Sequence, residues 1–330
     1  MRKWLDQQVL VTGAGGFIGS HLVEALVDKG AKVRAFVHYN SRGDAGLLRL
    51  SPRETLEKIE IIAGDIRDPQ AVAAAVDGCS TVFHLGALIS IPYSYVHPVE
   101  VAETNIMGTV NILTACREKA VERVVHTSTS EVYGTALRVP IDEAHPLQGQ
   151  SPYSASKIGA DKLAESYHDA FGLPVVTVRP FNTFGPRQSA RAVIPTIITQ
   201  ALAADVIHLG NLDSRRDFTY VLDTVAGFMR AAEAESVEGE VFNLGTGSEI
   251  RIGELAEKII QIVGRRVLIE TDENRLRPEQ SEVMRLLSDN NKARRMIHWQ
   301  PETSLDQGLE QTIRWIKDHL DLYQVGKYEF

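Results

Sequence analysis

Apolar residues in the first half of the chain fall into short, β-branched runs that alternate with longer segments of helical period. Uninterrupted apolar runs are typical of strands buried on both faces, and helices place apolar residues three and four positions apart. The pattern predicts an α/β fold, a doubly wound parallel sheet with helices on both faces. The predicted strands are Val9–Thr12, Lys32–His38, Ile59–Ala63, Thr81–Leu85, Arg123–Ser128 and Val175–Arg179. The predicted helices are His21–Lys29, Pro69–Val76, Asn105–Glu118 and Ala155–Phe171.

The pattern becomes less regular after residue 180. Loop residues follow at Pro180, Gly185 and Pro186, and two amphipathic helices are predicted later, at Ile252–Val263 and Leu305–His319. We expect a dinucleotide-binding Rossmann domain over residues 1–180 and a smaller C-terminal α/β substrate lobe over residues 181–330. No Pro/Ser-rich linker separates the two, so they are expected to pack tightly, with some interleaving.

Composition narrows the classes of partner. With 330 residues, 44% of them apolar, the chain can bury a large core, and its net charge of −8 argues against binding nucleic acid or anionic membranes. No apolar stretch is long enough to span a bilayer, and the first predicted strand leaves no room for a signal peptide. Cys79 and Cys116 lack metal-ligand spacing and are expected to be buried thiols. We therefore expect a cytoplasmic protein without a metal site.

A glycine-rich segment lies between the first predicted strand and the first predicted helix. Gly13, Gly16 and Gly19 allow a tight turn, close approach to a pyrophosphate and close packing of helix on strand. The amides of Phe17 and Ile18 would then face the phosphates at the positive end of the helix dipole. This context predicts dinucleotide binding.

The end of the second predicted strand carries no acidic residue to hold the adenosine ribose of NAD. The segment beginning at His38 instead offers Asn40 and Ser41 for ribose hydroxyls and Arg42 for a 2′-phosphate, although Arg42 is equally compatible with a solvated loop. The choice between NAD and NADP stays open on these residues. Asp65, after the third predicted strand, suits an adenine amino group or the cap of the next helix.

Two polar clusters suggest catalysis. Tyr153 and Lys157 are one helical turn apart on the same face, and a lysine cation near a phenol would lower its pKa and make it a usable base. Thr129 and Glu131 follow the fifth predicted strand, where a parallel sheet presents catalytic side chains. Thr129 can bind a sugar hydroxyl; Glu131 supplies a carboxylate or serves as a helix N-terminal charge, and Tyr133 is assigned to packing.

These motifs occur in one order over nearly the whole chain. The matching positions are Gly13/Gly16/Gly19, Asp65, His84–Ala87, Asn105, Thr129–Gly134, Tyr153/Lys157, Arg179–Gln188, Arg216–Asp223, Asn243–Gly247 and Trp299–Trp315. On these residues the sequence resembles the extended short-chain dehydrogenase/reductase family, in its nucleotide-sugar epimerase/dehydratase branch. The resemblance favours NAD, tightly bound and recycled. It implies that Tyr153 removes the proton of the sugar C4 hydroxyl, Lys157 holds the nicotinamide ribose and Thr129 orients the C4 oxygen. The predicted cofactor contacts also include Ile66, Leu85 and Ala87.

The resemblance also bears on the reaction. Glu131 stands where family 4,6-dehydratases keep a base for the C5 proton, and simple 4-epimerases usually carry no acid there. Ser130, however, replaces the Asp of deoxythymidine-diphosphate-glucose dehydratases and is too weak an acid to act alone. The triplet resembles GDP-mannose 4,6-dehydratases and UDP-glucuronate decarboxylases instead. A decarboxylase, with Arg191 as the cation for the C6 carboxylate, and a 4-epimerase stay open; the Tyr153/Lys157 pair disfavours a non-enzymatic sensor.

Residues 146–153 and 179–195 most resemble 4,6-dehydratases of the legionaminic acid pathway, which act on nucleotide-linked N-acetylglucosamine. The leading prediction is therefore a 4,6-dehydratase acting on UDP- or GDP-N-acetylglucosamine. Asn182 and Arg216 match family positions that hold the diphosphate, as does Arg277, although Glu279-Gln280 replaces the usual Gly-Asp. The other predicted substrate contacts are Ser130, Arg191 and Val193.

The family resemblance also implies a homodimer. Two predicted amphipathic helices, Val101–Cys116 and Ser154–Phe171, correspond to those that build a dimeric four-helix bundle. The same periodicity is compatible with burial of both helices within one chain.

Overall fold

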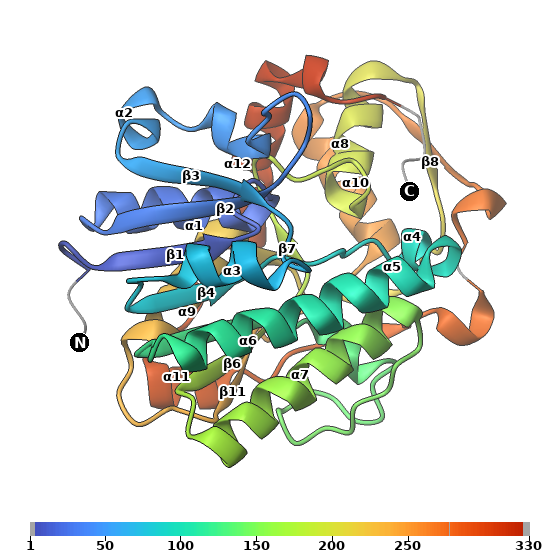
Figure 1. Ribbon diagram of the computed structural model, residues 1–330. Helices are drawn as coiled ribbons and strands as arrows, with labels where there is room; N and C mark the ends of the chain where they lie inside the picture. The colour runs from blue at the N-terminus through green and yellow to red at the C-terminus, as the bar shows by residue number, and fades with distance from the viewer. Residues whose placement is uncertain (1–3, 277, 326–330) are drawn as a thin grey trace.

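The computed structural model describes residues 4–276 and 278–325 and contains a seven-stranded parallel sheet (Figure 1). The strand order is β3-β2-β1-β4-β5-β6-β11, which confirms the doubly wound architecture. Each of the six predicted strands is present to within one residue at either end. The bounds are β1 Gln8–Thr12, β2 Lys32–His38, β3 Ile59–Gly64, β4 Thr81–His84, β5 Arg123–Thr127, β6 Val175–Pro180 and β11 Val241–Leu244.

Helices cover both faces of this sheet (Figure 1). One face carries α1 (Phe17–Asp28), α9 (Val221–Glu233) and α11 (Asn291–Ile297). The other carries α3 (Pro69–Val76), α6 (Gly108–Glu118) and α7 (Pro152–Phe171). A continuous helical run leads into α6 through α5 (Pro98–Ala102) and a π-helical turn at Glu103–Met107, so the predicted helix at Asn105 begins several residues earlier. The shorter helices are α2 (Arg53–Leu56) and α4 (Ile91–Val96).

The uninterrupted apolar runs are explained by burial on both sides of the sheet. Val9 and Val11 pack with Leu22 of α1, whereas Leu10 between them packs with Ile112 of α6 on the opposite face. Alternate residues of a strand point to opposite faces, so a strand covered twice needs apolar residues at every position. The free thiols of Cys79 and Cys116 are buried on the same face of the sheet as Leu10 and Ile112.

The smaller lobe has its own core. It comprises α8 (Val193–Ala203), α10 (Ile252–Val263), α12 (Leu305–Asp318) and the paired strands β8 (Val206–Leu209) and β13 (Leu268–Thr271). Short strands complete it: β9 Arg215–Arg216, β12 Ile250–Arg251 and β14 Arg285–Leu286 in one sheet, β7 Thr183–Phe184 and β10 Thr219–Tyr220 in another. Phe17 and Ile18, at the start of α1, pack against this core. The lobe therefore lies at the carboxyl end of β1, where doubly wound folds bind ligands.

The chain crosses between the two parts more than once. Strand β11 and helices α9 and α11 all follow residue 180, yet they pack on the large sheet. Strand β11 pairs with β6 in register from Val241 opposite Thr177 to Leu244 opposite Pro180. The seventh strand thus comes from the segment that the sequence assigns to the substrate lobe.

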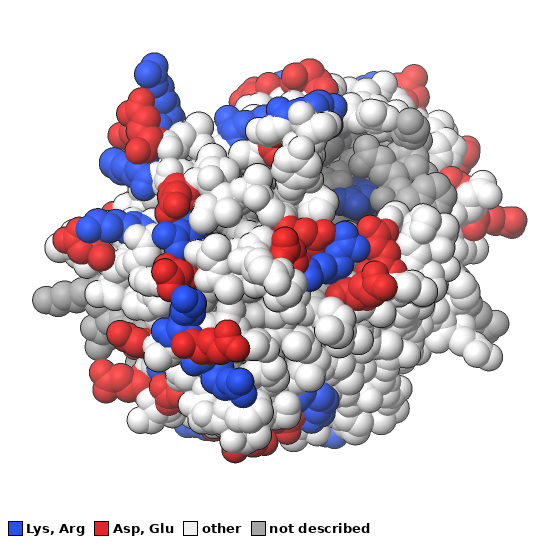
Figure 2. All heavy atoms as spheres, viewed as in Figure 1, with Lys and Arg blue, Asp and Glu red and all other residues white. Residues whose placement is uncertain are grey.

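The surface carries charges of both signs. Figure 2 shows acidic and basic side chains intermixed over the visible face instead of gathered into a single basic patch. Among residues 4–276 and 278–325, no helix has the length and apolarity needed to cross a bilayer.

Candidate active site

The glycine-rich turn is shaped to admit a phosphate. Gly13 has a φ of +67°, and a Cβ at this position would lie 2.9 Å from the backbone nitrogen of Gly86. A Cβ on Gly19 would lie only 2.2 Å from the carbonyl oxygen of Gly13. All residues of helix α1 are described, and the helix has no side-chain N-cap and no acidic residue in its first turn. Its N-terminal amides can therefore bind an anionic ligand. These features fit a dinucleotide pyrophosphate.

The loop after β2 is organised by Asn40. Its Oδ1 accepts hydrogen bonds from the backbone nitrogens of Arg42 and Asp44, and its Nδ2 donates to the carbonyl of Asp44 at 2.8 Å. His38, Ser41 and Arg42 are exposed. The side chain of Asn40 thus holds the loop that carries the predicted cofactor contacts Ser41 and Arg42.

Asp65 does not cap the helix that follows it. That cap is Asp68, whose Oδ1 accepts from the backbone nitrogens of Gln70 and Ala71. Asp65 forms a two-pronged pair with Arg67, at 2.7 Å between Oδ2 and Nη2, and the hydrogen bonds from Arg67 lower the pKa of the Asp65 carboxyl. Asp65 stays a predicted adenine contact.

The segment after β4 is fixed by buried polar residues. Thr12 Oγ1 lies 2.9 Å from Nδ1 of His84 and accepts a hydrogen bond from the backbone nitrogen of Gly86. Asn105 bonds both the N–H and the carbonyl of Leu88. These contacts hold the intervening backbone, which includes the predicted cofactor residues Leu85 and Ala87, beside the glycine turn. Nearby, the carbonyl of the predicted contact Ile66 accepts from Asn111 Nδ2 at 2.9 Å.

Tyr153, Thr129 and Glu131 come together at the carboxyl end of β5. Tyr153, in the first turn of α7, is 7% exposed, and the side chain of Thr129 lies close enough to influence its phenol. Burial raises the pKa of the Tyr153 phenol; Thr129 opposes that rise, and the charge of Glu131 adds to it. Thr129 also caps the 3₁₀ turn Ser130–Tyr133, accepting from the backbone nitrogen of Glu131 at 3.2 Å. A phenol and a carboxylate therefore share one strand end.

Lys157 does not have the direct effect on Tyr153 that the sequence suggested. Its Nζ donates a 2.6 Å hydrogen bond to the carbonyl of Thr127, the last residue of β5. The groups that set the Tyr153 pKa are burial, Thr129 and nearby carboxylates, and their net effect is upward. Burial in turn lowers the pKa of Lys157 to about 8. The net shift of the Tyr153 pKa is therefore upward, opposite to the lowering that we expected from this lysine.

The sequence pattern overlooked Asp161, one turn beyond Lys157 on α7. Its buried carboxylate accepts from His126 Nε2 at 3.1 Å, from Ser128 Oγ at 2.7 Å and from Arg179 Nη2 at 2.9 Å. Burial alone would raise the pKa of Asp161, but the hydrogen bonds and charges of these partners hold it at about 2. The spacing of Tyr153, Lys157 and Asp161, four residues each, was the available signal.

Tyr133 is a packing residue, as the sequence suggested. It is fully buried, and its hydroxyl donates to Asn243 Oδ1 at 2.7 Å and accepts from Arg179 Nη1 at 2.9 Å. Burial raises the pKa of Tyr133 to about 12. The neighbouring candidate Ser130 is 2% exposed.

The predicted substrate residues differ in environment. Arg216 is buried, 6% exposed, with Nη2 3.5 Å from Glu282 Oε1, and Asn182 donates to the carbonyl of Asp217 at 3.2 Å. Arg191 is exposed; its backbone N–H and Nε both donate to the hydroxyl of Ser189. The remaining candidates are Val193, half-buried at the start of α8, and Arg277, which lies outside the described residues.

Comparisons with known proteins point to one family. A family model described as GDP-mannose 4,6 dehydratase matches residues 10–312. The UDP-glucose 4-epimerase of Mycolicibacterium smegmatis is 33% identical over 318 residues, 94% of this chain and 99% of the relative. The dTDP-D-glucose 4,6-dehydratase of Mus musculus is 31% identical over 325 residues, 94% of this chain and 89% of the relative.

A solved structure agrees with these matches. The dTDP-glucose 4,6-dehydratase DesIV of Streptomyces venezuelae, with NAD and TYD bound, superposes with a TM-score of 0.86 at 29% identity. The alignment covers 96% of this chain and 99% of that chain. The family match and the shared fold together show that this chain is an enzyme of the GDP-mannose 4,6 dehydratase family, within the extended short-chain dehydrogenase/reductases that include nucleotide-sugar dehydratases and epimerases.

Proposed function

We propose that the protein is a nucleotide-sugar 4,6-dehydratase. The observation that carries the proposal is the convergence of Tyr153, Thr129 and Glu131 at the carboxyl end of β5, with the Glu131 charge close enough to act on the Tyr153 phenol. A 4-epimerase needs a base at C4 only. A second carboxylate beside that base supports chemistry at C5.

NAD is the proposed cofactor. The close backbone approaches at Gly13 and Gly19 and the uncapped start of α1 fit its pyrophosphate, and the solved relative DesIV holds NAD. When bound, NAD would accept the hydride that leaves the sugar C4 and return it to C6. Lys157, in the second turn of α7, is the residue we assign to the nicotinamide ribose.

The proposed steps use this chain's own groups. Tyr153 takes the proton of the C4 hydroxyl while Thr129 orients the C4 oxygen, and C4 becomes a ketone. The ketone acidifies the C5 hydrogen; Glu131 removes that proton and delivers it to the departing C6 hydroxyl, which leaves as water. Hydride adds to C6 and a proton adds to C5, giving a 4-keto-6-deoxy sugar. Glu131 acts as both base and acid because Ser130 is too weak an acid.

The proposed substrate is N-acetylglucosamine linked to UDP or GDP. Support comes from the likeness of residues 146–153 and 179–195 to dehydratases of that substrate class. The buried guanidinium of Arg216 suits a diphosphate, because a planar fork binds phosphate oxygens in pairs and explains how an acidic protein holds an anion.

A 4-epimerase is the second candidate, favoured by the 33% identity to the UDP-glucose 4-epimerase of M. smegmatis. A decarboxylase of UDP-glucuronate is the third. It would require a cation at the C6 carboxylate, and Arg191 is the residue available for that role.

One experiment separates the candidates. UDP- and GDP-linked N-acetylglucosamine, glucose and mannose, and UDP-glucuronate, are incubated with the enzyme in D₂O and followed by proton NMR. The dehydratase produces a C6 methyl group with deuterium at C5. A product that keeps its C6 hydroxyl and its C5 hydrogen identifies an epimerase, and release of carbon dioxide from UDP-glucuronate identifies a decarboxylase. Either of the last two outcomes overturns the proposal.

We also propose a homodimer formed through α6 and α7, which pack side by side at the front of the molecule (Figure 1). Apolar side chains on this helical layer are exposed, among them Val99 (68%), Met107 (50%) and Phe171 (53%). Sedimentation velocity of the wild type and of Met107→Glu tests the proposal: a dimer that the charge splits supports it, and a wild-type monomer refutes it.

A further inference from the structure

Lys157 and Asp161 anchor α7 to three consecutive residues at the end of β5. The Lys157 ammonium donates to the Thr127 carbonyl at 2.6 Å. The Asp161 carboxylate, one turn further along, accepts from the residues on either side, His126 and Ser128. The Lys157 ammonium and the Asp161 carboxylate thus both hydrogen-bond the strand end that leads into Thr129.

We infer that Asp161 is a positioning residue: by holding His126 and Ser128 it fixes the strand end that receives the Lys157 ammonium, one helical turn from its own carboxylate. This inference rests on the proposed function, because it concerns the lysine of the proposed Tyr153/Lys157 pair. Both side chains are almost fully buried, Lys157 at 4% and Asp161 at 5% exposure, so their charges are weakly screened.

The charged surroundings of Lys157 favour this role. Its charge interacts with Asp161 on the same helix, with His84 on β4 and with His126 on β5. Burial lowers the pKa of both histidines, and the charge of Lys157 lowers it further. Arg179 is paired with Asp161 at 2.9 Å. Burial also lowers the pKa of Lys157, and the charge of Asp161 opposes this.

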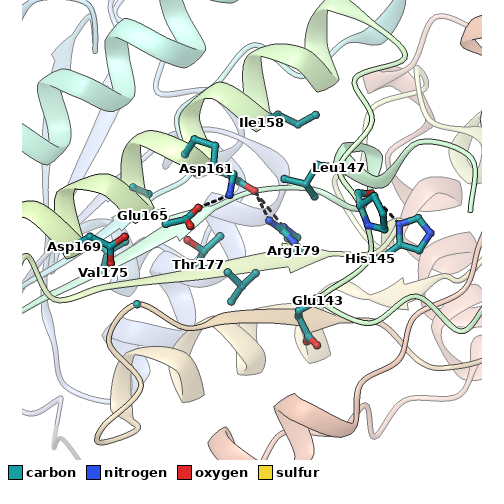
Figure 3. Close-up of a pocket in the computed structure, with 15 residues that line it drawn as sticks. Glu143, His145, Leu147, Ile158, Asp161, Glu165, Asp169, Val175, Thr177 and Arg179 are labelled. Atoms are coloured by element: carbon teal, nitrogen blue, oxygen red, sulfur yellow. Dashed lines mark hydrogen bonds and ion pairs between the residues drawn. The ribbon is translucent and has the colours of Figure 1, made fainter. Parts of the chain in front are cut away.

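The ion pair of Asp161 and Arg179 also borders a cavity away from the predicted catalytic residues. Asp161 and Arg179 line a groove of about 690 Å³ between α7, β6 and β11, together with Thr177 and Glu143 (Figure 3). Glu165, one turn beyond Asp161, lines the same groove and pairs with Lys162 at 2.6 Å on the exposed side of α7. Glu165 is therefore a matched control: it lies on the same helix and in the same groove, and its carboxylate pairs with Lys162.

The test is a pH titration of the Lys157 side chain by NMR in protein with ¹³C-labelled lysine, with Lys157→Arg used to assign the signal. Asp161→Asn is expected to lower the titration midpoint of Lys157 by about one pH unit or more, as loss of a nearby opposite charge does. The alkaline limb of the kcat profile should move down with it, at little change in KM. Glu165→Gln should leave both unchanged.

Asp161→Asn leaves Arg179 as a buried cation without its carboxylate, and the variant can fail to fold for that reason. The double variant Asp161→Asn/Arg179→Met removes both charges and should show a smaller decrease in the midpoint, because a nearby cation is lost with the anion. A Lys157 midpoint that is unchanged in the folded variants overturns the inference. If the midpoint falls but the wild type converts no nucleotide sugar, the positioning role stands and the proposed function fails.

Discussion

The Tyr133 hydroxyl donates a 2.7 Å hydrogen bond to Oδ1 of Asn243, joining the turn after β5 to the edge strand β11. The same hydroxyl accepts from Arg179 of β6, and Asn243 Nδ2 donates to the carbonyl of Ile141. These hydrogen bonds therefore connect β11, which comes late in the sequence, to the segment after β5 that carries Thr129 and Glu131.

Tyr133→Phe is expected to destabilise the protein without direct loss of chemistry. The change leaves Asn243 Oδ1 and one Arg179 N–H without this partner in a fully buried site, a loss of about 1–3 kcal/mol in the free energy of unfolding. Urea denaturation measures it. Tyr39→Phe, at a side chain that is 65% exposed, is the control and should change stability little. Equal stability of the two variants would contradict the buried role.

The strand pattern of the large sheet was predictable because each strand is buried on both faces, so its apolar run carries the signal in every residue. Strand β11 was not predictable in this way, since Val241–Leu244 has four residues and contains the polar Asn243. Its place is set by pairing with β6 and by the hydrogen bonds of Asn243, which are long-range contacts. Short elements of this kind are fixed by tertiary context.

Gly19→Ala is expected to weaken dinucleotide binding. The new Cβ would lie 2.2 Å from the Gly13 carbonyl oxygen, so the turn and the start of α1 must move apart. We expect the Kd for NAD, measured by calorimetry, to rise at least about tenfold, a loss of about 1.4 kcal/mol. Gly253→Ala in α10, whose nearest contact would be an ordinary 3.6 Å, should bind NAD like the wild type. Unchanged affinity in Gly19→Ala would argue against this cradle.

Tyr153→Phe is expected to lower kcat/KM by about 100-fold or more, because removal of a general base commonly costs this much. The variant should fold, since phenylalanine keeps the buried ring, and loss of one hydroxyl with a single polar partner costs about 1 kcal/mol. Initial rates on the nucleotide sugar identified by NMR, together with thermal melts, test both statements. Retained turnover in a folded variant would exclude Tyr153 as the base.

Glu131→Gln is expected to separate oxidation from elimination. With Tyr153 and Thr129 intact, the variant should still oxidise C4. This oxidation is measured as a rise in the absorbance of the reduced nicotinamide. It should form no C6 methyl group and incorporate no deuterium at C5 in D₂O, because the amide cannot take the C5 proton. Thr129→Val is the comparison variant and should slow the first step instead. Full dehydration by Glu131→Gln would refute the role of this carboxylate.

The candidate site was predictable where spacing alone defines it and not where folding brings distant groups together. Tyr153 and Lys157 share a helix face, so their separation of four residues in the sequence is enough to predict that they lie close together. The direction of the Tyr153 pKa was not predictable, because it depends on burial and on which carbonyl receives the lysine ammonium. Asp161 was overlooked because its partners His126 and Arg179 lie on two other elements.

The buried Asp161 carboxylate predicts a specific dependence of stability on acid. Its pKa in the folded protein, about 2, lies below the ordinary 3.8, so its charge stabilises the fold above pH 4. As the pH falls from 4 to 2, the unfolded chain binds this proton first, and about 2 kcal/mol of stability is lost. The difference in unfolding free energy between wild type and Asp161→Asn should shrink by about that amount over this interval.

Urea denaturation at pH 2, 3, 4 and 7 measures this difference, since carboxylates that titrate alike in both proteins cancel. Glu165→Gln is again the control, because its ion pair with Lys162 is more than half exposed on both sides and such pairs contribute little. Its difference from the wild type should stay below about 1 kcal/mol at every pH. A difference between wild type and Asp161→Asn that is constant from pH 4 to pH 2 would mean that the Asp161 pKa is not depressed. The hydrogen bonds from His126, Ser128 and Arg179 would then do no more than offset the cost of burial.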